Sequence, residues 1–493
     1  MAFFRRPRPN SASQPSPMPH NEAENVFSMH MYRIPIIITL AVVFFGSCRK
    51  TELIDAGPES VRCSADTIRF DTVFTTAGSA TTGFLIFNLE DQPVSISAAR
   101  LARGNASMFQ MNIDGVPGPV ARQIRIEARD SIYVFVTVRI DPDAATNPFL
   151  IRDSLLIELQ GRTQSVILEA WGQNARFLRN VVITGDTRFD RTLPYVILGG
   201  LQIARNARLT IEPGSRIHLH ADAPILVDGS LVTRGSAAEP VTFTGDRLDE
   251  GYRNLPASWP GIYLRVSSTD NRLTHARILN AYNGIVAEGP SAANRPKLIL
   301  DRCLIDNAYE AGIAGSGSSI EAENCQVSNC GKNILLLKGG EYLFKHCTVA
   351  SFSHALIPHK YPVFTVQNWD STRQGVTTYP VSVQVDNSII WGDEGTVEQE
   401  FFTSRRGANP FQVNLRNCLF RGSADPANAV LSNGLRNQPP QFDSINTTKR
   451  YFDFRIRKKL SPALNRGLPG LVVRDLDDMP RDAQPDLGAY ERQ

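Results

Sequence analysis

Between Leu273 and Gly422 the chain repeats one pattern of apolar and polar positions six times. Most copies alternate apolar and variable positions, then carry two polar residues, a small residue and a second apolar run; the first copy is shorter. Alternation with period two is typical of β-strands rather than helices. The copies are LTHARILN (273–280), LILDRCLIDN (298–307), IEAENCQVSN (320–329), YLFKHCTVAS (342–351), VQVDNSIIWG (383–392) and VNLRNCLFRG (413–422).

The small residue of each copy sets the register of the repeat. The steps between these residues are 27, 22, 22, 41 and 30 positions, and the shortest is too short for a helix-pair repeat. The spacing predicts a parallel β-helix in which each copy is one coil and equivalent residues stack, with loops or an unrecognised coil in the longer steps. The stacked residues are Ala276, Cys303, Cys325, Cys347, Ser388 and Cys418.

Four of the seven cysteines occupy this stacked position. A small, polarizable side chain suits a buried position, and a disulfide between neighbouring coils would strain the parallel ladder. The 22-residue spacing follows from the coil, and no CxxC pair is present. We therefore expect a structural row of buried free thiols at Cys303, Cys325, Cys347 and Cys418, continued by Ser388, and neither a metal site nor a cofactor.

An all-β segment precedes the repeat. Period-two alternation at 67–74, 83–88, 131–140, 153–159 and 165–171, with turn signals between, predicts a sandwich of about seven strands over residues 63–175. DTVF (71–74), FLIFN (84–88), IYVFVTVRIDP (132–142) and VILEAWGQ (166–173) resemble the immunoglobulin-like modules of the ASH/HYDIN type. The aromatic residues of this segment occupy core-type positions, so we expect no binding platform on it.

The β-helix is expected to span residues 176–460. LTIEPG (209–214), a coil from Gly229 to Gly235, VTFTG (241–245) and WPGI (259–262) resemble the first coils of bacterial right-handed β-helix proteins. The resemblance implies a right-handed, single-stranded parallel β-helix of the pectin-lyase-like type, and glycine and proline suit its tight corners.

The C-terminal segment, residues 461–493, carries three short motifs. SPALNRG (461–467), the run from Asp475 to PR (480–481), and PDLGAYE (485–491) resemble the choice-of-anchor Q module found on many bacterial right-handed β-helix proteins. This resemblance supports the fold and says little about function.

The N-terminal residues 1–48 carry an export signal. Residues 34–45 form an apolar run after Arg33, which suits a signal peptide and is too short to span a bilayer comfortably. Gly46-Ser47-Cys48 after this run resembles the bacterial lipoprotein box, which implies acylation of Cys48 and a place in the cell envelope, in the outer membrane. An ordinary signal peptide is the alternative, and Met29 or Met31 is a candidate start. Residues 49–62 are expected to be a linker.

Composition narrows the class of partner. Hydrophobic residues make up 42% of the 493 positions, and the net charge is +3. Apart from RRPR at 5–8 there is no block of basic residues, so we expect no nucleic-acid partner.

Each residue of the repeat that could take part in catalysis can also be interpreted as a structural residue. Outward charges at Asp301, Arg302, Lys345, His346 and Arg416 could serve a polysaccharide lyase or hydrolase, but no converging pair of carboxylates and no matching motif is present. We expect most of them to be solvated or turn residues. The outward positions that belong to the same set are Glu321, Glu323, Asn324 and Asp386.

Four further features each allow a functional and a structural interpretation. His218 and His220 share one strand face, which suits a metal ligand pair or an exposed edge. The loop from Asp246 to Tyr252 could bind a sugar or act as a structural lid. Asp475, Asp477 and Asp478 could bind calcium, but lack the glycine and glutamate of a calcium loop. The amides expected to stack at a bend are Asn280, Asn307 and Asn329.

The sequence therefore predicts a membrane-anchored exported lipoprotein that binds the membrane through its lipid. Its β-helix would be a non-catalytic binding or scaffold surface, with a polysaccharide or another cell-surface partner as ligand. The alternative is a carbohydrate-active enzyme of the pectate-lyase-like type. Enzymatic activity stays open, and the sequence favours its absence.

Overall fold

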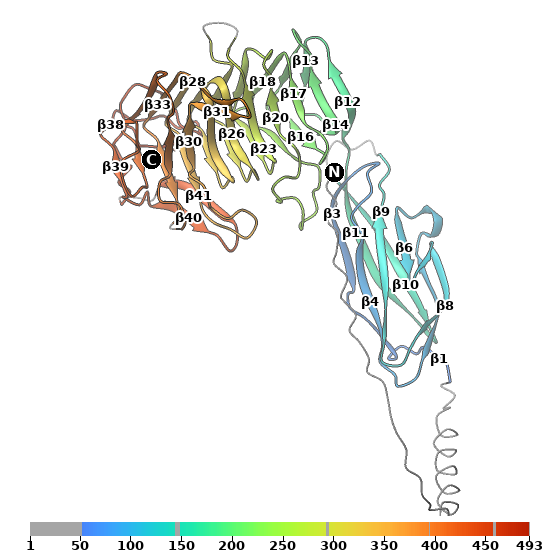
Figure 1. The fold of residues 1–493 in the computed structure, drawn as a ribbon. Helices are drawn as coiled ribbons and strands as arrows, with labels where there is room; N and C mark the ends of the chain where they lie inside the picture. The colour runs from blue at the N-terminus through green and yellow to red at the C-terminus, as the bar shows by residue number, and fades with distance from the viewer. Residues whose placement is uncertain (1–51, 143–147, 292–294, 394, 457–459, 493) are drawn as a thin grey trace, which may run out of the picture.

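The computed structural model describes residues 52–142, 148–291, 295–393, 395–456 and 460–492. Apart from one short 3-10 turn, Gly104–Ala106, every regular element in these ranges is a β-strand, which confirms the all-β prediction. A strand sandwich follows the N-terminal segment, and a long stack of short strands meets it at an angle (Figure 1). In the described ranges no helix has the length and apolar character needed to cross a bilayer.

The sandwich consists of a six-stranded and a five-stranded sheet that share one core. Alternate residues point into this core, as in β9, where Val134 and Val136 are buried between exposed neighbours. The six-stranded sheet contains β1 (Ile54–Asp55), β5 (Val94–Leu101), β10 (Phe149–Leu159), β11 (Arg162–Gln173), β3 (Thr67–Phe74) and β8 (Val120–Ile126). The five-stranded sheet contains β2 (Val61–Cys63), β4 (Thr82–Asn88), β9 (Ser131–Val138), β6 (Phe109–Ile113) and β7 (Val116–Pro117).

Two of these strands lie in the segment that the sequence assigned to a linker. Ile54 of β1 pairs with Val94, and Val61 of β2 pairs with Asn88. The short strands escaped the alternation pattern because two or three residues are too few to show a period.

The outer face of β9 differs from the expectation for the sandwich. Tyr133 and Phe135 point outward, are exposed, and stack with their ring centroids 5.5 Å apart. Phe135 also covers Gly83 of the neighbouring strand. The prediction that all aromatic residues of the sandwich occupy core positions is therefore wrong, because alternation along β9 turns these two away from the core.

The second body is one continuous 26-stranded sheet of parallel pairings, wound into a β-helix. Except at the C-terminal end, each coil contributes one strand to each of three faces, which we call sheets I, II and III in chain order. Leu300, for example, pairs with Leu273 in the coil before and Ala322 in the coil after. The predicted parallel β-helix is confirmed by this register.

The strands of the β-helix divide among the three faces as follows. Sheet I contains the first part of β14 (Tyr195–Ile203), then β16 (Arg216–Leu219), β19 (Val241–Gly245), β22 (Ala276–Leu279), β25 (Leu304–Asp306), β27 (Gln326–Ser328), β29 (Thr348–Ser351), β34 (Ile389–Gly392), β37 (Leu419–Phe420) and β39 (Leu435–Arg436). Sheet II contains β17 (Ile225–Val227), β20 (Ile262–Leu264), β23 (Asn283–Glu288), β30 (Phe364–Gln367) and β35 (Phe401–Ser404). Sheet III contains β13 (Thr187–Phe189), β15 (Arg208–Ile211), β18 (Ser230–Arg234), β21 (Asn271–Thr274), β24 (Leu298–Asp301), β33 (Val381–Asp386), β36 (Phe411–Arg416) and β38 (Val430–Ser432). Four long strands bend from one face to the next: β12 (Arg176–Ile183) and β14 run from sheet I into sheet II, while β26 (Ala311–Glu323) and β28 (Lys332–Lys345) run from sheet II into sheet III.

A second, smaller core attaches the C-terminal residues to the outside of sheet I. The hairpin β40 (Phe442–Asn446) and β41 (Tyr451–Ile456) packs with residues 461–491 against Ala350, Ile389 and Leu419. We call the hairpin and residues 461–492 the C-terminal cap. The remaining hairpin, β31 (Trp369–Thr372) and β32 (Gly375–Thr378), projects from the long connection after β30.

Candidate functional site

The predicted small residues line the interior of sheet I, one per coil. Cys303, Cys325, Cys347, Ser388 and Cys418 are all buried, and the four cysteines are free thiols. Their donors bond backbone carbonyls, as in Cys325 Sγ to Glu323 O at 3.2 Å and Ser388 Oγ to Asp386 O at 2.8 Å. Burial raises the pKa of the Cys325 thiol, and its neighbours Cys303 and Cys347 raise it further. Thiolate chemistry is therefore disfavoured at Cys325.

The residue before each small residue turns the chain from sheet III to sheet I. Each of these residues has a positive φ, between 44° at His275 and 53° at Arg302. Asparagine tolerates this left-handed region better than other side-chain-bearing residues, which explains its frequency in the repeat. We call the set the corner row: His275, Arg302, Asn324, His346, Asn387 and Asn417.

The C-terminal cap covers the corner row. Arg302 pairs with Asp478 at 2.5 Å, and Asn324 Oδ1 accepts from Arg481 at 2.7 Å. His346 lies fully buried, with Nδ1 3.2 Å from the carbonyl oxygen of Asp486. Of the two roles expected for Asn324 and His346, the turn residue is confirmed by their positive φ and the solvated side chain is wrong, because the tail folds back over residues more than 100 positions earlier.

Burial changes the protonation of His346. Desolvation, with Arg481 nearby, lowers the pKa of His346 to about 2. The neutral ring accepts from Asn387 Nδ2 at its Nε2, 2.8 Å away. A buried neutral imidazole with both nitrogens occupied has no free position for a substrate proton, so His346 stabilises the packing of the cap.

The motifs of the tail serve the same packing. Arg481 and Glu491 form an ion pair 2.9 Å apart, with exposed side-chain fractions of 1% and 2%. Burial lowers the pKa of Arg481 and raises that of Glu491. Asp475 accepts from the backbone N–H groups of Met479 and Glu491, and Asp486 accepts from that of Asn465. The motif residues satisfy one another inside the cap, which is a structural role.

The aspartates considered for calcium are also engaged by protein groups. Asp477 pairs with Arg455 at 2.7 Å and Asp478 with Arg302. In the described part of the chain, no cluster of three or more His, Cys, Asp or Glu side chains could hold a metal ion.

The charges on the outside of sheet III pair between or within coils. Glu323 and Lys345 lie 2.6 Å apart on neighbouring strands. Asp386 is completely buried and accepts two bonds of 2.7 Å from Arg416. Asp301 pairs with its neighbour Arg302 at 2.9 Å. Six of the positions that the sequence offered for catalysis are thus held in three separate ion pairs on this face.

The amides predicted to stack do so in part. Asn307 Nδ2 donates to Asn280 Oδ1 at 2.7 Å, where the chain turns from sheet I to sheet II. Asn329 instead donates to Asp306, at 3.0 Å, so the stacked amides end at Asn307. Positive φ values of 62°, 60° and 51° at these asparagines give the same backbone reason as in the corner row.

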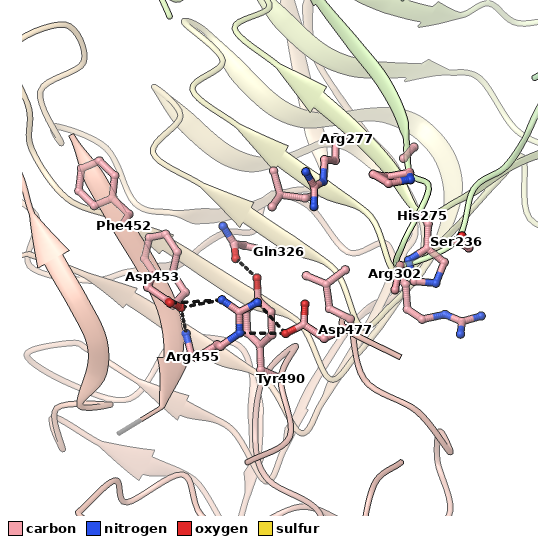
Figure 2. A pocket seen from close by; sticks show the side chains of 16 residues that line it. Ser236, His275, Arg277, Arg302, Gln326, Phe452, Asp453, Arg455, Asp477 and Tyr490 are labelled. Carbon is pink, nitrogen blue, oxygen red and sulfur yellow. Dashed lines mark hydrogen bonds and ion pairs between the residues drawn. The ribbon is translucent and has the colours of Figure 1, made fainter. Parts of the chain in front are cut away.

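A groove opens where the cap stops covering sheet I (Figure 2). It has a volume of about 280 Å³ and lies between β22 and β25 on one side and β41 and the tail on the other. Arg455 pairs with Asp453 and Asp477, and Tyr490 donates to Gln326 at 2.5 Å. The other side chains that line it include Ser236, His275, Arg277, Arg302, Leu304, Phe452, Phe454 and Leu476.

Arg277 is the notable cation of this groove. Its side chain is exposed on the outer face of β22, and it forms no ion pair with any described carboxylate. Arg302 and Arg455, by contrast, are already paired. The repeat alone gave no sign of this groove, because its second wall comes from residues 452–490.

The two histidines of β16 have different surroundings. Phe74 of the sandwich packs on His218 with ring centroids 5.0 Å apart, and burial lowers the pKa of His218 to about 4. His220 pairs with Asp246 at 2.7 Å. The expectation of an exposed edge is wrong for His218, because the sandwich docks on this part of the first coils.

Cys48, the predicted lipidation site, lies outside the described residues.

Comparison with known proteins yields distant structural similarities. No protein-family model and no curated protein matches the chain. Pectate lyase Pel9A matches over 65% of this chain and 88% of its own, at 13% identity and a TM-score of 0.31. A family 123 glycoside hydrolase from Clostridium perfringens matches over 23% of this chain and 25% of its own, at 8% identity and a TM-score of 0.17. A C. elegans member of the MSP family matches over 23% of this chain and 97% of its own, at 13% identity and a TM-score of 0.15. The strand pairing described above establishes the β-helix by itself.

Proposed function

We propose that this chain is an exported lipoprotein of the bacterial cell envelope, anchored in the outer membrane through Cys48, whose β-helix binds polysaccharide without cleaving it. The apolar run at residues 34–45 and the following Gly-Ser-Cys support export and anchoring. The sandwich then acts as a spacer between the anchor and the β-helix.

One observation carries the non-catalytic part of the proposal. The residues offered for catalysis, Arg302, Lys345 and His346, are held by Asp301 and Asp478, by Glu323 and by the cap. General acid–base catalysis needs a titratable group within reach of the substrate and free to exchange a proton. These side chains instead stabilise neighbouring coils.

The groove beside Arg277 is the polysaccharide site that fits this proposal. An unpaired guanidinium can take a carboxylate of an acidic sugar through two parallel hydrogen bonds. Phe452 supplies an apolar surface in the same groove. A volume of about 280 Å³ is at the lower end for small-ligand sites, so the groove would hold a short part of a longer chain.

Binding and cleavage are tested on the same protein. Acidic polysaccharide should bind saturably, and Arg277→Gln should weaken binding about tenfold, which corresponds to the loss of one charged contact. Arg272→Gln is the matched control, since Arg272 is an exposed arginine on the outer face of sheet III. Equal binding by the Arg277→Gln and Arg272→Gln proteins would refute the groove as the site.

Incubation of the protein with the polysaccharide should yield neither a conjugated double bond absorbing in the ultraviolet nor new reducing ends. Either product, lost in the Arg277→Gln protein, would replace this proposal with a carbohydrate-active enzyme.

Anchoring has its own test. Cys48→Ala should release the processed protein from the membrane or leave it as a precursor, because a stable lipid anchor needs the acyl chains attached at that residue. Cys63→Ala, a change at a partly buried cysteine of β2, is the control and should stay with the membrane. A processed Cys48→Ala protein retained through washing without detergent would refute the lipid anchor.

A further inference from the structure

A cavity of about 730 Å³ lies between the sandwich and the first coils of the β-helix. Its walls are β3 with the loop that follows it, the outer face of the first strands of sheet I, and the loop from Asp246 to Tyr252. A volume of this size is well within the range of sites for small organic ligands. The groove at Arg277 is on another part of the β-helix and shares no lining residue with this cavity.

The joint that forms the cavity is held by several contacts. Strands β11 and β12 are separated by only Asn174 and Ala175, both buried. Phe74 packs on His218 and on Phe177, at 5.0 and 6.5 Å between centroids. The short connection and these contacts favour a preformed cavity over a transient gap.

The loop from Asp246 to Tyr252 is fixed to both bodies. Its Glu250 N–H donates to Asp71 of the sandwich at 2.5 Å. On the other side, Asp246 pairs with His220 of the β-helix at 2.7 Å. From the sequence, this loop could be either a sugar-binding loop or a structural lid. In the structure it forms one wall of the cavity.

The charges of the cavity wall cancel. Three arginines and three aspartates line it, and Arg247 holds Asp249 through two bonds of 2.7 Å. His220 Nδ1 bonds Asp246 Oδ2 at 2.7 Å, and Nε2 has no hydrogen bond to any described residue. The remaining charged side chains of the wall are Arg69, Arg179 and Asp71. A wall without net charge does not favour an ionic ligand.

The uncharged part of the wall combines hydroxyl groups with apolar and aromatic surface. Tyr252 is 48% exposed, and the Arg247 guanidinium lies 3.9 Å from its ring centroid. The hydroxyl side chains are Thr72, Thr76, Ser79, Thr81 and Thr82, and the apolar ones include Val73, Phe177, Val196, Leu198 and Leu248. Hydroxyls donate and accept, so such a wall suits a ligand with many hydroxyl groups and apolar C–H faces.

We infer that the cavity binds a short, neutral oligosaccharide between the two domains. Tyr252 provides the surface on which a sugar ring stacks, and His220 Nε2 and the threonine hydroxyls bind the sugar hydroxyls. This site deepens the proposed function and rests on it, since it adds a second, chemically different glycan site to the same binding protein.

The test measures binding of short neutral gluco-, manno- and xylo-oligosaccharides to the full-length protein by calorimetry, with an acidic oligogalacturonide beside them. At least one neutral series should bind. Tyr252→Ala should weaken that binding about tenfold, the change expected for loss of an aromatic contact, while Tyr252→Phe retains it. Ala80→Trp should also weaken it, by filling the cavity from the sandwich side.

The acidic probe separates this inference from the proposed function. Its binding should be insensitive to Tyr252→Ala and Ala80→Trp and sensitive to Arg277→Gln. The inference is overturned if the neutral probes do not bind the unmodified protein, or if they bind both cavity variants as tightly as the unmodified protein. Neither result would contradict the proposed acidic-sugar site in the groove. If the Tyr252→Ala protein also lost binding of the acidic probe, it would have a general folding defect. Binding of the neutral probes by the Ala80→Trp protein, changed in the other domain, would then decide whether the cavity is their site.

Discussion

The guanidinium of Arg481 and the carboxylate of Glu491 form an ion pair 2.9 Å apart inside the C-terminal cap, with both side chains almost completely buried. The same guanidinium donates to Oδ1 of Asn324 on the corner row, at 2.7 Å from Nη2. One arginine therefore links the last motif of the chain to the middle of the β-helix. The contact fixes the cap to the repeat.

Breaking this pair should detach the cap. Arg481→Met leaves Glu491 buried without its partner, which costs about 3–5 kcal/mol, whereas the double change with Glu491→Met should cost less than either single one. Denaturant unfolding followed by hydrogen exchange in residues 461–492 measures this. Arg474→Met is the control, because its pair with Asp478 is exposed and should contribute less than about 1 kcal/mol. Equal effects of the two arginine changes would contradict the structural role.

The thiols of the stacked cysteines Cys303, Cys325, Cys347 and Cys418 should be inaccessible to reagents in the native protein. In a background with Cys48 and Cys63 changed to Ser, a thiol reagent should react only after denaturation, since the remaining cysteines are buried. Cys325→Ala should have a small effect, while Cys325→Lys should unfold several coils by burying an unpaired charge. Rapid reaction of the folded protein with the reagent would show that the side chains do not point inward.

Acid should loosen the cap through His346. The pKa of His346 is about 2 in the folded protein and near 6.5 when unfolded, so acid adds its proton only on unfolding. Stability should therefore fall as the pH drops below about 6.5, by about 1.4 kcal/mol per unit for one such histidine. His346→Asn keeps a residue suited to the left-handed corner and removes the titrating group.

Unfolding midpoints from about pH 7 to pH 4.5 compare the two proteins. The His346→Asn protein should show the smaller loss over this range. Asp486 and Glu491, whose pKa values are raised by burial, act in the opposite direction and are present in both proteins. Identical pH profiles would mean that His346 does not stay neutral in the fold.

Lys297 should be a structural lysine. Its side chain is fully buried, and Nζ donates to the carbonyl oxygens of Arg265, Val266 and Glu288, at 3.1, 2.9 and 2.5 Å. Lys297→Met leaves these carbonyls unsatisfied and should cost about 2 kcal/mol or more. Lys338→Met, at a partly exposed ion pair, should cost less than about 1 kcal/mol in the same unfolding experiment.

Much of the β-helix could be predicted because its coil is a local repeat. Cys303 and Cys325 sit 22 residues apart, and their neighbours Leu304 and Gln326 pair directly in the structure. The corner asparagines follow from the same local rule, since few side chains tolerate a positive φ. The pattern is visible in the sequence because the same backbone geometry and the same packing recur in every coil.

The environment of the outward residues could not be predicted in the same way. His346 has the alternation of an outward turn residue, yet it is buried by a segment 140 positions later. His218 likewise reads as an edge residue and is covered by Phe74 of the sandwich. Nothing in a local pattern records which distant segment folds over a face.

The sequence by itself therefore determined the strand class, the register of the coils, the buried small-residue row and the corners, because these depend on residues within one coil and its neighbour. Only the tertiary structure decided which faces stay open. The cap covers the later strands of sheet I and leaves the groove at Arg277, and the docking of the sandwich creates the cavity at Tyr252. Both sites are formed by segments far apart in the chain, and their contacts depend on how whole domains pack rather than on any repeat.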